Sequence, residues 1–121
     1  MSRTIAILLT AALGLGATAA NAHPRLQSSN PAPGALLKSA PKDIRMSFSE
    51  GLVPNFTGLE LKTAAGKSIP TGKAILAAGD DKKIVVPIGA RLTPGTYTVA
   101  WHAVSVDTHR VTGSYSFKVM R

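Results

Sequence analysis

The chain has 121 residues, with 14 lysines and arginines against 6 aspartates and glutamates, which gives a formal net charge of +8. It contains no cysteine, so disulfide bonds and thiolate metal sites are excluded and packing alone must stabilise the fold. The basic residues are spread singly except for Lys82-Lys83. We therefore expect a solvated, mildly basic surface and no nucleic-acid partner, with contact to anionic lipid as the alternative.

Residues 1–22 have the pattern of a removable export signal. One arginine near the start is followed by an apolar run at residues 5–16 and by the small-x-small sequence Ala20-Asn21-Ala22. The apolar run is shorter than the roughly 20 residues that a membrane span needs. We expect cleavage after Ala22, which leaves residues 23–121 as one mature, periplasmic domain.

Two other outcomes are open at this end of the chain. The segment could stay attached as an N-terminal anchor. The peptidase could also cut after Ala20, although Thr18 would then stand where a smaller residue is preferred.

The mature segment predicts short strands separated by turns. Apolar and polar residues alternate at 44–48, 59–61 and 111–119, and residues 84–86 form a β-branched run. Residues 35–40 allow at most one helical turn. About seven short strands predict an all-β fold, an antiparallel β-sandwich or small barrel.

The segment 92–99 narrows this fold class. Its sequence, Leu-Thr-Pro-Gly-Thr-Tyr-Thr-Val, is typical of the tyrosine corner of immunoglobulin-like sandwiches, where the tyrosine hydroxyl bonds back to the backbone. Trp101 continues the phase of Tyr97 and Val99. We expect these three side chains to face the core.

His23 would be the first residue of the mature chain, so its α-amine and imidazole could chelate one metal ion. Pro24 has no backbone N–H, so chelation must stop at residue 23. Asp107 and His109 lie two apart at a strand end, where their side chains project to the same side. Together these groups make a four-coordinate set of three nitrogens and one oxygen. Such a set favours Cu(II), with Zn(II) as the alternative.

His102 has the opposite phase to Trp101, and we expect it on the surface, away from the other two histidines. A β-bulge between Trp101 and Asp107 is the alternative, because it would re-aim the end of the strand.

Five motifs in order span nearly all of residues 23–121: His23-Pro24-Arg25-Leu26, Asn30 to Gly34, Phe48 to Leu52, Leu92 to Tyr97, and Trp101 through Asp107-Thr108-His109 to Phe117. In these motifs the chain resembles the CopC family of periplasmic copper-binding proteins. That resemblance implies a Greek-key β-sandwich that binds Cu(II) through His23, Asp107 and His109. It also places Glu50 near the copper, as a weak ligand or as a plain surface carboxylate.

The resemblance implies a monomeric copper carrier or buffer, without catalysis, that binds one Cu(II) and serves a CopD-like inner-membrane transporter. Some family members bind Cu(I) in a methionine-rich loop, but residues 64–82 contain no methionine or histidine here. The alternatives are a copper enzyme like the lytic polysaccharide monooxygenases, which also use an N-terminal histidine, and an adhesion module with incidental histidines.

Overall fold

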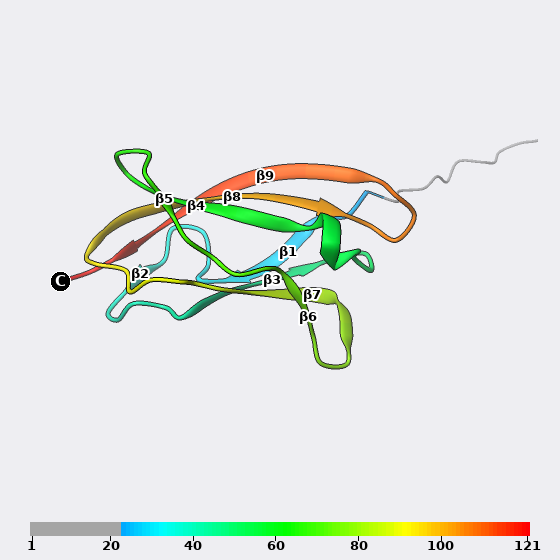
Figure 1. Cartoon of the computed structure of the whole chain (residues 1–121), viewed down its shortest axis with the longest axis horizontal. Coiled ribbons are helices and arrows are strands. Elements are labelled where there is room, and N and C mark those ends of the chain that lie inside the picture. The colour runs from blue at the N-terminus through cyan, green and yellow to red at the C-terminus, as the bar shows by residue number, and fades with distance from the viewer. Residues whose placement is uncertain (1–22) are drawn as a thin grey trace, which may run out of the picture.

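The computed structural model describes residues 23–121, and the predicted export signal lies outside the described residues. In residues 23–121 no helix has the length and hydropathy needed to cross a membrane. The described residues form nine strands and one 3-10 turn (Figure 1). These are β1 Leu26–Asn30, β2 Leu36–Leu37, β3 Asp43–Phe48, η1 Pro54–Phe56, β4 Gly58–Thr63, β5 Ser68–Ile69, β6 Ile75–Ala77, β7 Asp80–Pro87, β8 Gly95–Val104 and β9 Arg110–Val119.

The strands form two sheets that pack face to face, as the predicted β-sandwich requires. One sheet has the order β1-β3-β7-β6 and the other the order β2-β9-β8-β4-β5. The longest hairpin, β8-β9, is paired without a break, from Gly95 opposite Val119 to Val104 opposite Arg110. It runs the length of the sandwich, from the end where the chain finishes to the end where the described residues begin (Figure 1).

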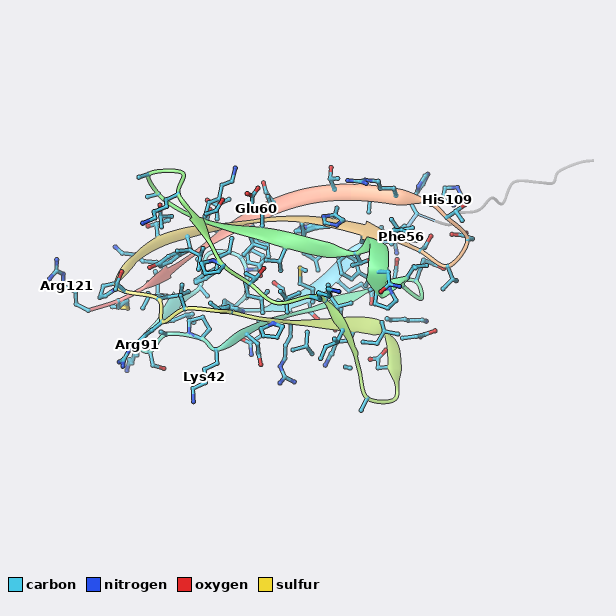
Figure 2. The ribbon with its side chains drawn as sticks, viewed as in Figure 1. Lys42, Phe56, Glu60, Arg91, His109 and Arg121 are labelled. Carbon is cyan, nitrogen blue, oxygen red and sulfur yellow. The ribbon has the colours of Figure 1, made fainter. Side chains whose placement is uncertain are left out.

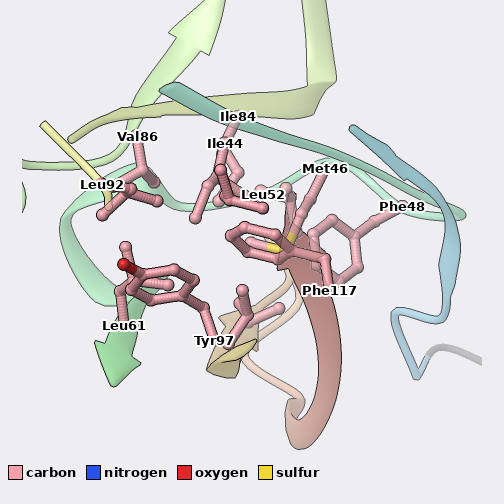
Figure 3. Close-up of a cluster of buried hydrophobic side chains, with 13 residues drawn as sticks. Ile44, Met46, Phe48, Leu52, Leu61, Ile84, Val86, Leu92, Tyr97 and Phe117 are labelled. Atoms are coloured by element: carbon pink, nitrogen blue, oxygen red, sulfur yellow. The ribbon is translucent and has the colours of Figure 1, made fainter. Parts of the chain in front are cut away.

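The core forms where the alternating residues of both sheets meet (Figure 3). Ile44, Met46 and Phe48 are at most 1% exposed, as their phase in β3 predicts. The tyrosine corner is confirmed, because the buried Tyr97 hydroxyl donates a hydrogen bond to the Thr93 carbonyl at 2.6 Å. This bond fixes the start of β8 and therefore the register of the long hairpin.

Trp101 faces the core as predicted, although it is half-buried rather than fully enclosed. Its indole packs edge to face on Phe48, with ring centroids 5.3 Å apart. On the neighbouring strand it lies directly over Gly113, its register partner. A glycine is required there because a side chain would occupy the space of the ring.

Residues 35–40, for which the sequence allows at most one helical turn, form no helical turn. Residues 36–37 form β2, which pairs in parallel with the end of β9. The backbone N–H groups of Lys118 and Met120 donate to the carbonyls of Ala35 and Leu37 at 2.9 and 2.8 Å. Two-residue strands such as β2 and β5 also explain why nine strands form where about seven were predicted.

Candidate metal centre

The described chain begins at one end of the sandwich, and its first residues are fixed by packing and by β3. Pro24 is fully buried. The Arg25 N–H donates to the Ser49 hydroxyl at 2.9 Å, and the Arg25 carbonyl accepts from the Ser49 N–H at 2.9 Å. Since residues 24 and 25 are held in this way, the exposed His23 is confined to the same end of the sandwich.

The β8-β9 turn lies at this end too. The Ser105 N–H donates to the His109 carbonyl at 2.9 Å, and the Thr108 N–H donates to the Ser105 carbonyl at 2.8 Å. Thr108 has a φ of 73°, the left-handed conformation that completes such a turn. Asp107 and His109 therefore flank a tight turn rather than follow one another along an extended strand as we predicted.

Asp107 and His109 nevertheless converge. The Asp107 Oδ1 atom lies 3.3 Å from His109 Nδ1 and accepts a hydrogen bond from the Ser105 hydroxyl. The Ser105 hydroxyl also accepts from the His109 N–H at 3.3 Å. The hydrogen bond from Ser105, together with His109, holds the pKa of Asp107 below its ordinary value. The carboxylate is therefore ionised at neutral pH.

The imidazole of His23 lies against that of His109. The two ring centroids are 4.9 Å apart and the ring planes are close to perpendicular, at 86°. Figure 2 shows His109 at the end of the sandwich opposite Arg121. Two histidines from opposite ends of the described chain therefore meet at one exposed place, with the Asp107 carboxylate beside them.

These three side chains are neighbours, but they are not yet arranged as ligands. Within residues 23–121, no three His, Cys, Asp or Glu side chains form a ready-made metal cluster. Asp107 Oδ1 faces His109 Nδ1, which leaves His109 Nε2 pointing away from the carboxylate. The remaining predicted donor is the α-amine of residue 23, which exists only if cleavage takes place after Ala22.

Glu50 precedes Gly51, which is bonded to this turn, but within residues 23–121 no hydrogen bond or ion pair joins Glu50 to either histidine. β3 ends at Phe48 and the chain bends at residues 49 and 50, so the alternation that buries Ile44, Met46 and Phe48 does not extend to Glu50. In the described part of the chain, Glu50 forms no ion pair or side-chain hydrogen bond. Its neighbour Gly51 is bound to the turn, because its carbonyl accepts from the Val106 N–H at 2.9 Å.

His102 lies on the outer face of the five-stranded sheet, opposite in phase to Trp101 as predicted, and it is half-buried. Burial and the nearby Arg110 lower its pKa. The register of β8 with β9 is regular through this segment, so the alternative of a bulge inside β8 is not observed. His102 therefore belongs to the sheet surface and not to the histidine pair.

Ser105 is the residue that sequence reasoning missed. It is 1% exposed, and it joins Asp107 to the backbone of His109. The available signal was its phase: Ser105 follows Val99, Trp101 and Ala103 on the inward side of β8. A serine at a buried position needs a hydrogen-bond partner, and here the partners are two predicted ligands.

Two imidazoles and a carboxylate suit a divalent metal of intermediate softness, such as Cu(II) or Zn(II). Among residues 23–121, none of the soft thioether ligands that Cu(I) prefers is near this end. Met46 is buried in the core, and Met120 follows β9 at the opposite end of the sandwich. The donor chemistry therefore fits the predicted metal and gives no basis for a thioether site beside it.

Comparison with known proteins gives one consistent result. A model of the CopC domain matches residues 26–120. Copper resistance protein C of Pseudomonas syringae pv. tomato is 42% identical over 124 aligned residues, which cover 98% of each chain.

Two crystal structures have the same fold. One is PcoC, a methionine-rich copper resistance protein from Escherichia coli, with a TM-score of 0.73 and 38% identity. That comparison covers 81% of this chain and 99% of the other. The other is CopC from Methylosinus trichosporium OB3b, with a TM-score of 0.76, 24% identity, and coverage of 81% and 94%.

Proposed function

The chain belongs to the CopC family, and on that premise we propose that it is a periplasmic protein that binds one Cu(II) ion and carries or sequesters it. Copper binding is the property common to the family. The oxidation state, the number of ions and the ligands are our proposal. The observation that carries it is the contact between His23 and His109, whose rings are 4.9 Å apart although the residues come from distant segments.

We assign the ligands as follows. After cleavage at Ala22, His23 supplies its α-amine and imidazole, and Pro24 prevents the next backbone nitrogen from joining them. His109 supplies an imidazole and Asp107 a carboxylate. Ser105 holds that carboxylate beside His109 before the metal arrives, which lowers the ordering needed on binding. Glu50 is at most a weak ligand or a neighbour of the site, since within the described residues no ion pair or side-chain hydrogen bond joins it to the histidines.

A single Cu(II) site is supported by the methionine content. The chain has 3 methionines, of which Met1 lies in the predicted signal and Met46 in the core. PcoC is named as methionine-rich, whereas residues 64–82 here contain no methionine. A second, thioether site for Cu(I) therefore has no candidate ligands in that segment.

We propose a carrier or buffer rather than an enzyme. Its relatives are named for copper resistance and not for a reaction. In a monooxygenase-like site, oxygen would need an open coordination position, and Asp107 stands beside His109 where it would fill one. The partner that fits this role is a CopD-like inner-membrane transporter, and the protein would work as a monomer.

The test is Cu(II) affinity measured by competition with a chelator, on protein whose mass shows that it begins at His23. His23→Ala and His109→Ala should each weaken binding by about a hundredfold or more, which corresponds to roughly 2.8 kcal/mol. His102→Ala is the matched control and should leave affinity unchanged. If all three variants bound copper like the wild type, the proposed site would be wrong.

A further inference from the structure

The end of the sandwich opposite the histidines has a grooved, strongly basic surface. Three adjoining depressions cover it, and the neighbouring ones have residues in common: Ser39, Ala40 and Arg91 for one pair, and Pro94, Val119 and Met120 for the other. Figure 2 shows Lys42, Arg91 and Arg121 together at this end, with His109 at the other. We call the five cations that line the depressions the basic pole: Lys38, Lys42, Arg91, Lys118 and Arg121.

No carboxylate side chain lines these depressions. All five cations are exposed, and none forms an ion pair within residues 23–121. The nearest carboxylate along the chain, Asp43, is paired with Arg45 at 3.2 Å. The basic pole therefore carries five positively charged side chains, and no carboxylate side chain lines the same depressions.

The charge at the histidine end is balanced instead. The side chains of its segments include four carboxylates and four cations, so the formal charges of these side chains cancel. These groups are Glu50, Asp80, Asp81 and Asp107 against Arg25, Lys82, Lys83 and Arg110. The excess positive charge of the described domain is therefore concentrated away from the metal centre, and the molecule has a strong electric polarity along its length.

Apolar side chains are exposed within the basic pole. Leu36, the first residue of β2, is 65% exposed and pairs in register with Lys118. Met120 is 42% exposed and lines two of the three depressions. Exposed leucine and methionine surrounded by lysine and arginine match the two layers of a membrane interface, where cations meet the phosphates and apolar groups enter beneath them.

We propose that the basic pole docks on the surface of a bilayer that contains anionic phospholipid. Charge complementarity points to an anionic partner. The cations are spread over three adjoining depressions, with apolar groups between them, and this spread fits a laterally continuous surface better than it fits one acidic protein patch. In this orientation the histidine pair faces away from the bilayer, where it can take up copper from solution.

The test measures binding of the purified chain, starting at His23, to vesicles of phosphatidylethanolamine and phosphatidylglycerol at 0.1 M salt. Wild-type protein should bind these vesicles and not vesicles of phosphatidylcholine. Each cation near an anionic surface contributes about 1 kcal/mol, which is about fivefold in partition. The triple variant K38Q/K42Q/R91Q should therefore bind about a hundredfold more weakly.

The matched control is K73Q/K82Q/K83Q, which removes the same charge from elsewhere in the domain and should retain most of the binding. Equal losses in the two triple variants would overturn the proposal, because net charge alone would then explain the attraction. Failure of the wild type to prefer anionic vesicles would also overturn it, and is the result expected if the basic pole recognises an acidic protein. Copper is absent from this assay, so its failure leaves the copper assignment unaffected.

The orientation is tested separately with a polarity-sensitive dye. The chain has no cysteine, so single cysteines can be introduced at Ser39 in the basic pole and at Val106 beside the histidines. Anionic vesicles should raise and blue-shift the emission of the dye at position 39 only. A response at position 106 and none at position 39 would contradict the proposed orientation.

Discussion

Replacing Gly113 with alanine should disturb the packing of strand β9 against Trp101 of strand β8, the two strands that meet in the turn of the metal centre. A Cβ at residue 113 would lie 2.4 Å from Cζ2 and 2.7 Å from Cε2 of Trp101, whereas ordinary contacts begin near 3.4 Å. The ring has little room to retreat, because it packs on Phe48, which is 1% exposed. The indole or strand β9 must therefore shift by about 1 Å, a degree of overpacking that costs about 1–3 kcal/mol.

For a domain of this size, that cost lowers the melting temperature by about 5–15 °C. Thermal unfolding of the copper-free protein, followed by circular dichroism, measures it. Gly58→Ala is the matched control, since it adds the same methyl group to strand β4, on the other side of β8. Its Cβ would lie 3.4 Å from His102, an ordinary contact, so we expect little change. Equal melting temperatures for both variants and the wild type would refute this description of the packing.

The remaining predictions concern the turn between β8 and β9. Ser105→Ala removes the hydrogen bond that does most to lower the pKa of Asp107, so that pKa should rise toward its ordinary value, as measured by NMR titration of the carboxyl group in copper-free protein. The lowered pKa of Asp107 contributes stability that is present at neutral pH and is lost as the pH falls through that pKa. The wild type should therefore lose more stability than Ser105→Ala on acidification. An unchanged pKa of Asp107 in Ser105→Ala would contradict the role of Ser105. Thr108→Gly removes the strain of holding a β-branched residue in the left-handed conformation. It should raise the melting temperature of copper-free protein by about 2–5 °C, and a melting temperature below that of the wild type would contradict this prediction.

The parts of the fold that were predicted from sequence are those that local periodicity determines. Residues 44–48 and 111–119 alternate because each strand has one buried face, and the structure buries the expected side. Tyr97 was predictable because the tyrosine corner has a local signature. By contrast, β2 contains two residues and pairs with a strand that follows far later in the chain, so it has no period to detect.

In the candidate site too, some features could be predicted from the sequence and others could not. The contact between His23 and His109 was inferred from the export signal and the family resemblance, and spacing alone could not have given it. The turn at Thr108 was missed because left-handed positions favour glycine and asparagine over threonine. Glu50 was placed near the copper by the family resemblance, whereas β3 ends before it, at Phe48.

The basic pole could not have been predicted, since its charges are single residues in three separate segments of the chain, 38–42, 91 and 118–121. Lys38 and Lys118 both line it although they are far apart in the sequence. Only the pairing of β2 with β9 brings their segments together. A sequence in which basic residues are spread singly can therefore still fold into a surface with concentrated charge.

The central claim is that the α-amine of His23 binds copper together with the two imidazoles. The most direct measurement is a Cu(II) titration followed by electron paramagnetic resonance, on protein that begins at His23 and on protein with a ten-residue, histidine-free extension before it. The extension keeps both imidazoles and removes the amine from residue 23. We predict an axial spectrum with nitrogen couplings for the first protein, and a changed spectrum with affinity lower by about a hundredfold for the second. Identical spectra and affinities would contradict the claim.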